Sequence, residues 1–500
     1  MMGAQQNQNN LWSYHVNLDK RVRGDHPLRQ IEKLIDFTFI HKEVKQFYGA
    51  NGNVSVDPAV ILKLMFLLFY DDVRSERELM RIVPERLDYL WFLGYGLDDE
   101  VPDHSVLSKA RRRWGKDVFE ELFRRVLLQC LAQGLVEGGK IHLDASLVRA
   151  HASLNSIREL PPELVEVLRR TVAKLEEPPS QDAAAKEEDP SSRGGGVNQN
   201  HVSLTDPAST LVRHGSGKSV PSFKHHRVVD DRCGVITAVE TTTGMVDEGQ
   251  RLESLIEQHQ ANTGLEVETV VADSKYGTNG NFIACQERGL RSHMGNLSAR
   301  QNNTGRRKDI FGPEQFKYDR RTDTYACPAG QKLHRRRLHP TKRTWDYWTD
   351  RGVCQQCSLR EQCTRSAQGR SLQRHEHEDL LQRARRQSAS RQGKLDRKRR
   401  QHLQERSFAD AANRHGFKRA RWRGLWRQQI QDLLIAAIQN IRILLGAVRK
   451  GEIRPFLALK LMRYRIKAAI QLLNSILIRF FPANREKINP LSYAFANLTP

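Results

Sequence analysis

Two short apolar runs that each lead into an aspartate constrain the fold of this chain more than any other feature. Residues 140–144 read KIHLD and residues 266–273 read EVETVVAD, and both are rich in the aliphatic residues of buried strands. A polar turn with a glycine, Ser274–Gly277, follows the second run. Open α/β sheets bind ligands at the rim where their strands end. We therefore expect Asp144 and Asp273 to close two strands of one sheet and to face a common site.

The sequence between and after these runs predicts the rest of a mixed α/β sheet. Residues 222–229 and 235–243 predict the two strands of a hairpin, and residues 248–260 and 279–288 predict helices. The order strand, insertion, hairpin, helix, strand, helix is typical of a mixed sheet. Between about 155 and 220 a helix precedes low-complexity sequence, which predicts a flexible surface insertion.

Helices are expected on the N-terminal side of the sheet, and Val56–Ala59 has the pattern of an N-cap followed by proline in the first helical turn. Residues 11–135 read as mostly helical, and the segment 105–114 carries four cations. These are Lys109, Arg111, Arg112 and Arg113. The segment is either one helix of a small bundle or a helix that contacts DNA phosphates or a groove.

The charge balance points to a polyanionic partner. The 500 residues hold 81 Lys and Arg against 58 Asp and Glu, a formal net charge of +23. Such an excess indicates nucleic acid, although a merely basic soluble protein is the simpler alternative. The polar start predicts no signal peptide, and the apolar segment 456–481 is interrupted by cations, so no membrane span is expected. Seven cysteines in so long a chain fit a reducing cytoplasm.

Three acids are candidates for a metal site. Two carboxylates held together repel each other unless a divalent cation neutralises them, and hard oxygen ligands suit Mg²⁺ or Mn²⁺. Two such ions can clamp the attacking and leaving oxygens of a phosphodiester displacement. Asp144 and Asp273 could instead be ordinary strand-end residues. Glu405, in a basic helical segment, is either a third ligand or a partner in an ion pair.

Four of the cysteines are spaced as in a zinc module. Cys327, Cys354, Cys357 and Cys363 form C-x26-C-x2-C-x5-C in a basic segment punctuated by Gly and Pro. Four thiolates can hold a tetrahedral structural zinc, with His334 or His339 as possible substitutes. Reduced free thiols, or a redox pair of Cys354 and Cys357, are the alternatives.

A basic stretch with aromatic residues follows the cysteines, and the sequence from Asp379 to Leu425 predicts helix. Residues 383–427 interleave cations such as Lys418 with Phe417, Trp422 and Trp426. Cations there can contact phosphate and aromatic rings can stack on unpaired bases. The alternatives are a solvated charged face for the cations and hydrophobic packing for the rings.

The chain resembles the DDE transposases of bacterial insertion sequences, in the subgroup with a four-cysteine insertion between the second and third acids. The resemblance covers roughly residues 20–445. It is carried by VPDHS at 101–105, HLDAS at 142–146, AHAS at 150–153, VVADSKYG at 270–277, ERSFAD at 405–410 and RWRGL at 421–425. Their order and spacing along the chain make the resemblance specific.

The resemblance implies an α/β fold with a ribonuclease H-like mixed sheet, an N-terminal all-α domain and a small Cys-rich zinc insertion. It implies that Asp144, Asp273 and Glu405 bind two Mg²⁺ or Mn²⁺ ions, which catalyse DNA nicking at element ends and attack of the freed 3′-hydroxyl on target DNA. The cations expected to contact double-stranded DNA are Lys109, Arg111, Arg112, Arg113, Lys275, Arg406, Arg414, Arg421 and Arg423. A homodimer or larger assembly on DNA, in the cytoplasm at the nucleoid, is expected.

The expected domains follow these motifs. They are a helical DNA-binding domain at 1–135, the first part of the catalytic core at 136–299, the Cys-rich insertion at 300–375, the completion of the core at 376–450 and a helical tail at 451–500. One position departs from the family pattern, because Ala412 stands where related enzymes often have a lysine two helical turns after the glutamate. The alternatives to an active transposase are therefore a catalytically impaired, DNA-binding derivative and a stand-alone nuclease.

Overall fold

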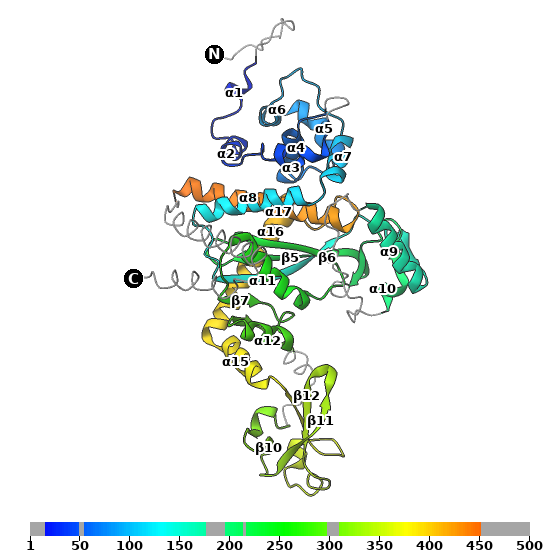
Figure 1. Cartoon of the computed structure of the whole chain (residues 1–500), viewed down its shortest axis with the longest axis vertical. Helices are drawn as coiled ribbons and strands as arrows, with labels where there is room; N and C mark the ends of the chain where they lie inside the picture. The colour runs from blue at the N-terminus through cyan, green and yellow to red at the C-terminus, as the bar shows by residue number, and fades with distance from the viewer. Residues whose placement is uncertain (1–15, 50–54, 177–195, 214–216, 298–309, 452–500) are drawn as a thin grey trace, which may run out of the picture. The chain divides into compact units, whose positions relative to one another are not determined.

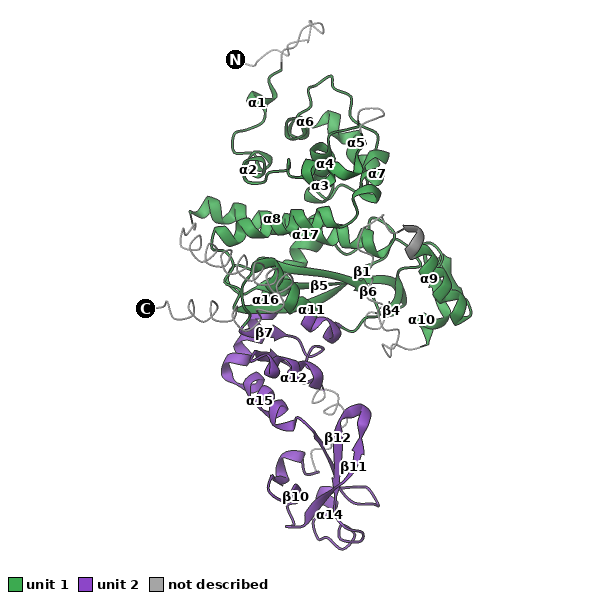
Figure 2. Cartoon of the chain, in the orientation of Figure 1, with its two compact units in different colours: residues 1–247, 254–267, 402–500 green, residues 248–253, 268–401 purple. Residues whose placement is uncertain are grey.

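The computed structural model describes residues 16–49, 55–176, 196–213, 217–297 and 310–451. These residues fall into two compact units (Figure 2). Unit 1 comprises residues 1–247, 254–267 and 402–500, and unit 2 comprises residues 248–253 and 268–401. The low-complexity residues 177–195 and the predicted tail at 452–500 lie outside the described residues.

In the described residues, unit 1 begins with eight α-helices, which confirms the helical N-terminal region. They are α1 (Leu18–Arg21), α2 (Pro27–Leu34), α3 (Ile40–Val44), α4 (Pro58–Tyr70), α5 (Glu76–Ile82), α6 (Leu87–Leu93), α7 (Ser105–Trp114) and α8 (Asp117–Ala132). Helix α4 starts where Asp57 accepts a hydrogen bond from Ala59 N–H and Pro58 occupies the first turn. Its residues are apolar nearly all round, and eight of them are buried, so it is the centre of this helical region.

The sheet of unit 1 is antiparallel. Strand β1 (Lys140–Arg149) pairs with β5 (Ser219–Asp230), whose other edge is shared by β4 (Thr210–Arg213) and β6 (Ile236–Thr243). The expected end of the first strand at Asp144 is wrong, because β1 continues to Arg149 and residues 145–149 pair with residues 222–226 of β5. Asp144 therefore lies in the middle of a strand.

The segment 155–220, expected to be a flexible insertion, contains several helices and strands in its described residues. These are β2 (Ile157–Glu159), α9 (Pro162–Glu176), α10 (Val197–Asn200) and β3 (His201–Ser203), and β2 pairs with β3. Strand β4 extends the main sheet at Thr210–Arg213, before the predicted start of the hairpin. Backbone pairing to neighbouring strands therefore gives this segment more order than its composition indicated.

Helix α17 (Leu425–Lys450) joins the helices and the sheet of unit 1 into one hydrophobic core. It lies along α8 (Figure 1) and also packs on α4 and β6, so its two faces are covered. By length and composition it could cross a membrane, but 83% of its most apolar window is buried in the unit. Its Asn440 binds the backbone of Ile236 on β6 through both amide atoms at 2.8 Å. Helix α17 is thus a core helix of unit 1.

Helix α16 (Arg391–His415) carries Glu405 and is shorter than the helical stretch expected to reach Leu425. It ends at His415, and Gly416 follows with a φ of +60°, a left-handed conformation that glycine adopts without strain. The His415 ring contributes to this stop, because its Nδ1 lies 2.7 Å from the carbonyl oxygen of Phe69 on α4. Residues 416–424 form a loop before α17, and α11 (Leu252–Thr263) completes the regular elements of unit 1.

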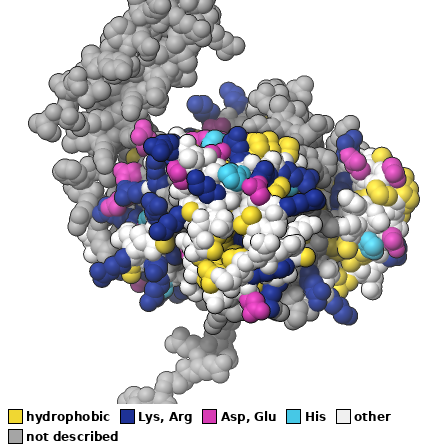
Figure 3. All heavy atoms as spheres, turned by 90° about the horizontal axis from the view of Figure 1, so that it is seen from below, with side chains coloured by type: hydrophobic (Ala, Val, Ile, Leu, Met, Phe, Trp, Pro, Cys, Tyr) yellow, Lys and Arg dark blue, Asp and Glu magenta, His cyan; other side chains and the backbone are white. Residues whose placement is uncertain are grey.

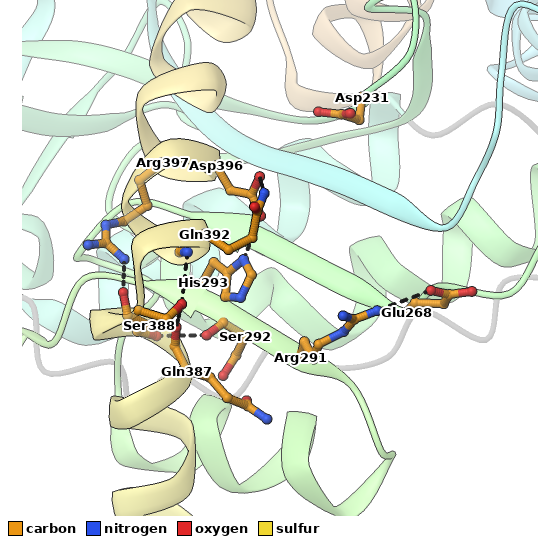
Figure 4. Close-up of polar contacts among 12 residues, drawn as sticks. Asp231, Glu268, Arg291, Ser292, His293, Gln387, Ser388, Gln392, Asp396 and Arg397 are labelled. Atoms are coloured by element: carbon orange, nitrogen blue, oxygen red, sulfur yellow. Dashed lines mark hydrogen bonds and ion pairs between the residues drawn. The ribbon is translucent and has the colours of Figure 1, made fainter.

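Unit 2 contains a parallel strand pair, β7 (Thr269–Ala272) and β8 (Arg291–Met294), with α12 (Asn279–Glu287) and α15 (Glu378–Ala389) packed beside β8. The parallel pair here and the antiparallel strands of unit 1 confirm the mixed α/β class. Figure 4 shows how β8 meets the helices that follow it. His293 Nδ1 lies 2.7 Å from Asp396 Oδ2 at the start of α16, and Ser388 Oγ donates to the carbonyl oxygen of Ser292 at 2.7 Å.

The Cys-rich segment of unit 2 forms a five-stranded antiparallel sheet in the order β13-β12-β11-β10-β9. The strands are β9 (Lys317–Asp319), β10 (Thr324–Ala326), β11 (Lys332–His339), β12 (Thr344–Trp348) and β13 (Ser371–His375), with α14 (Arg360–Cys363) between the last two. Four residues make its buried core, namely Phe316, Leu333, Tyr347 and Leu372. So small a core contributes little stability on its own.

Candidate active site

Asp144 lies in the middle of β1, on the face of the sheet that α16 covers. Its side chain is half-buried, and its Oδ1 accepts a hydrogen bond from Ala145 N–H at 2.9 Å. Arg227 on β5 is its partner in the strand register, and directly opposed residues share a face of the sheet. The Arg227 guanidinium reaches Ser407 on α16. Asp144 therefore points towards the helix that carries Glu405.

Glu405 is exposed, and its neighbours on α16 fix its position. Gln404 is fully buried and its Nε2 donates to the carbonyl oxygen of His142 on β1 at 2.8 Å. On the other side of Glu405, Ser407 Oγ accepts a hydrogen bond from Arg227 Nη1 at 2.6 Å. These two contacts hold α16 to β1 and β5 on both sides of the glutamate. Asp144 and Glu405 thus both belong to unit 1, and the residues that flank Glu405 contact the strands β1 and β5.

A buried polar network underlies these two acids. Arg227 is fully buried, and its Nε donates to His225 Nε2 at 2.9 Å, so that ring must carry its proton on Nδ1. His225 Nδ1 in turn lies 3.0 Å from Oδ2 of the buried Asp432. Burial lowers the pKa of Arg227 to about 9, while Asp432, Asp144 and Asp410 oppose the shift. The positive charge of Arg227 is thus stabilised by nearby carboxylates rather than by hydration.

Arg227 also ties both long helices to the sheet. Its Nη1 lies 3.2 Å from Gln439 Oε1 on α17, and its guanidinium stacks 4.1 Å from the ring centre of Phe408 on α16. Gln439 Nε2 donates to the carbonyl oxygen of Ser407 at 2.7 Å. A neutral side chain at position 227 would leave the charge of Asp432 without its compensating cation.

Asp273 follows β7 directly, as the sequence predicted, and belongs to unit 2. Its Oδ1 accepts a hydrogen bond from Lys275 N–H at 2.9 Å, so the turn after the strand fixes the carboxylate. The turn is held by Asn281, whose Nδ2 donates to the carbonyl oxygens of Tyr276 and Gly249 at 2.8 Å. The side chain of Asp273 is half-buried.

Glu248 is an acid that the sequence analysis missed. It is buried, with 6% of its surface exposed, and one of its carboxylate oxygens lies within 4.8 Å of one of Asp273. Lys275 Nζ donates to Glu248 Oε1 at 2.6 Å, so this expected DNA contact is already bound to an acid. Glu248 gave no signal because it opens a helical segment, where an acid is common.

Two of the cations expected on DNA make internal contacts instead. Arg111 is 3% exposed, is paired with Glu76 and stacks 3.9 Å from the ring centre of Trp422. Arg421 is paired with Asp72, donates to the carbonyl oxygen of Leu68 and has 11% of its side chain exposed. Both arginines hold the loop 416–424 to the helical region, and their contact with DNA stays a prediction. Trp422 is likewise buried, as is the neighbouring Phe417, so hydrophobic packing is the correct interpretation of these rings.

The other expected DNA contacts of unit 1 are exposed. On α7 these are Lys109, Arg112 and Arg113, and on α16 and the following loop they are Arg406, Arg414 and Arg423. Arg414 pairs with Asp410 at 3.3 Å in an i,i+4 pair. The face drawn in Figure 3 carries several groups of lysine and arginine side chains, with acids among them.

The four spaced cysteines line one cavity in unit 2. Its walls include Cys327, Cys354, Cys357 and Cys363, together with apolar side chains such as Phe311 and Leu333. Burial, and then the neighbouring thiols, raise the pKa of Cys363, while Arg370 opposes the shift. Gln331 N–H donates to Cys327 Sγ at 3.3 Å, and Thr349 Oγ1 and Cys354 Sγ are hydrogen-bonded at 3.2 Å, with either group able to donate. The two candidate histidines, His334 and His339, are not among the lining residues of this cavity.

Two protein-family models match this chain, one in its N-terminal helical region and one in its C-terminal half. Residues 16–113 match a family described as "Transposase domain (DUF772)". Residues 326–445, which contain the four cysteines and Glu405, match a family described as "Transposase DDE domain". The two matches identify the chain as a DDE transposase. No curated protein matches the transposase.

Solved structures give only distant likenesses to the transposase. A piggyBac transposase synaptic complex with hairpin DNA is 10% identical, with 94% of this chain and 82% of that chain covered and a TM-score of 0.31. A Mos1 transposase paired-end complex with the left transposon end is 13% identical, with 51% and 64% covered and a TM-score of 0.15. Such low scores carry no argument about the function.

Proposed function

We propose that this transposase nicks DNA at the ends of a mobile element and joins the freed 3′-hydroxyls to target DNA. Asp144, Asp273 and Glu405 would hold a pair of divalent metal ions in a ribonuclease H-like core. The observation that carries the proposal is the double anchoring of α16 around Glu405, to His142 on β1 and to Arg227 opposite Asp144. Glu405 itself is exposed on α16, so its carboxylate is accessible to a metal ion.

The donor set fits Mg²⁺ or Mn²⁺. Carboxylate oxygens are hard ligands, and neither Asp144 nor Asp273 is fully buried, so both can reach a hydrated ion. Bound ions of this kind would activate the attacking hydroxyl and stabilise the leaving oxygen. The side chains themselves form no covalent bond with DNA. Their contribution is to position the reacting groups and to offset charge.

DNA is the partner that the exposed cations fit. Lys109, Arg112 and Arg113 share one helix, and Arg406 and Arg423 flank the acid-bearing segment. Each cation that neutralises a phosphate releases counterions, so binding should weaken steeply as salt rises. Joining two element ends to one target would need at least two chains, so we propose that the transposase acts as a dimer or larger assembly at the nucleoid.

The deciding experiment is a strand-transfer assay with the DNA that flanks the coding region. Purified protein and Mg²⁺ should produce nicks at inverted repeats and products joined to target DNA, and removal of Mg²⁺ with EDTA should prevent both. Binding to these repeats without nicks or joined products in Mg²⁺ or Mn²⁺ would contradict the proposal. That outcome would favour the alternative based on Ala412, in which the protein is a catalytically impaired derivative that only binds DNA.

We further propose that the cysteine cavity holds a structural zinc ion. Four thiols on its wall are the ligand set of a closed tetrahedral site, and the N–H and hydroxyl donors at two sulfurs suit thiolates. A metal would also stabilise a sheet whose hydrophobic core is small. A redox pair of Cys354 and Cys357 alone would leave the convergence of Cys327 and Cys363 on this cavity without a role.

We expect purified protein to carry about one zinc ion per chain, because a structural site binds tightly. Cys357→Ser should lose the zinc and make residues 310–377 sensitive to protease, whereas Cys233→Ser, an exposed thiol outside unit 2, should change neither. Elemental analysis and limited proteolysis measure the two effects. A Cys357→Ser protein that keeps its zinc and its protease resistance would remove the site.

A further inference from the structure

One lysine beside Asp144 has no role in the fold or the site as described so far. Lys418 belongs to the loop 416–424, thirteen residues after Glu405 in the sequence. Its side chain is exposed at the base of α16. In the sequence, Lys418 is one of several cations of the basic stretch 383–427 that can contact phosphate, and no motif there relates it to Asp144 or Glu405.

The backbone around Lys418 is fixed to both elements that carry acids. Phe417 N–H donates to the carbonyl oxygen of Ala411 on α16 at 3.2 Å, which turns the loop back along the helix. Arg149 N–H at the end of β1 donates to the carbonyl oxygen of Lys418 at 3.0 Å, and Ala420 N–H donates to the carbonyl oxygen of Arg149 at 2.8 Å. Lys418 is thus held between the last turns of α16 and the strand of Asp144.

The side chain of Lys418 extends towards Asp144. Its Nζ donates to Ser146 Oγ at 2.7 Å. Ser146 lies two residues after Asp144 on β1, and alternate residues of a strand point to the same face. The ammonium therefore lies at Ser146, on the face of β1 that also carries Asp144.

The charge of Lys418 is not neutralised within the fold. Among the described residues, no carboxylate forms an ion pair with Lys418, whereas Arg414 is matched by Asp410 and Arg421 by Asp72. Partial burial, and then the charge of Arg227, lower the pKa of Lys418. A cation beside a second cation gains more from an added anion than a lysine that is already paired.

We propose that Lys418 binds a DNA phosphate oxygen beside Asp144 and holds the phosphate at the acids. This inference rests on the proposed strand-transfer function and names one substrate contact within it. Lys418 would also supply the cation that related enzymes often carry at the position of Ala412. Residues 405 and 412 share one face of α16, and the loop places Lys418 next to the turn that contains residue 412.

The test compares Lys418→Met and Lys418→Arg with the wild-type protein. Loss of a cation at a reacting phosphate is expected to slow cleavage and joining about 100-fold in Lys418→Met. Lys418→Arg keeps the charge and should stay within about tenfold of wild type. The slope of log affinity against log salt for end DNA should fall by about one in Lys418→Met, because one phosphate contact is lost. Lys116→Met, which removes an exposed lysine paired with Glu120 on α8, is the matched control and should leave the rates unchanged.

A rescue separates a phosphate contact from a structural role. Ala412→Lys in the Lys418→Met background should restore most of the lost rate, since it returns a cation to the same face of α16. Wild-type rates in Lys418→Met would overturn the inference, and so would a loss that is equal in Lys418→Arg or that Ala412→Lys leaves unchanged. If Asp144→Asn is inactive while Lys418→Met is normal, only this inference fails. If Asp144→Asn still cleaves, the proposed function fails instead.

Discussion

Asp144→Asn is expected to lower Mg²⁺-dependent cleavage and joining by about 1,000-fold or more, to the limit of detection. Asn has almost the same shape, so β1 and its pairing with β5 remain, but the charge that holds the metal is gone. Asp273→Asn and Glu405→Gln should have the same effect, because each metal ion needs the charge of more than one acid. A strand-transfer assay with the element ends measures the loss, and binding of the same DNA should stay within about twofold of wild type, since the cations that grip phosphate are untouched.

Glu268→Gln provides the matched control for the acids. Glu268 precedes β7 as Asp273 follows it, and its exposed carboxylate pairs with Arg291 at 3.3 Å. Its replacement should leave cleavage and joining unchanged. Full activity in any one of the three acid variants would remove that residue from the proposed metal site.

Gly277→Ala should unfold the turn that carries Asp273. A Cβ at this position would overlap the backbone carbonyl oxygen of Gly295, and no side-chain rotation can relieve a clash between backbone atoms. The turn is also tied by Gly277 N–H to the carbonyl oxygen of Ser274 and by Leu297 N–H to that of Gly277. We expect a loss of about 4 kcal/mol or more in the stability of unit 2, at the upper end for single substitutions. The thermal unfolding midpoint and the strand-transfer rate should both fall.

Gly280→Ala is the control, three residues further along on α12. A Cβ there meets no atom within 4 Å, and alanine favours helix over glycine, so stability should change by less than about 1 kcal/mol. Equal unfolding midpoints in the two variants would show that the backbone at Gly277 can move away from Gly295. The close approach would then not determine the position of Asp273.

Local patterns in the sequence were sufficient to predict most elements. The β-branched run before Asp273, the hairpin of β5 and β6 and the N-cap with proline that starts α4 all depend on neighbouring residues, and all three are confirmed. The end of β1 was predicted wrongly because its continuation depends on pairing with residues 222–226, which lie far along the chain. Helix α16 was predicted to be too long, because its stop depends on a contact between His415 and the backbone of Phe69.

The roles of the side chains, like the secondary structure, were predicted from the sequence only in part. The sequence by itself determined the residue types and spacings of the three acids and the four cysteines, since these are properties of the chain alone. Only the tertiary structure showed that Arg111 and Arg421 are held by acids inside unit 1 and that Glu248 lies beside Asp273. It alone placed the ammonium of Lys418 at Ser146, two residues after Asp144 on β1. Charge and hydrogen-bonding capacity belong to a residue, but whether they are neutralised within the fold or remain free for DNA depends on which distant residues the fold brings next to them.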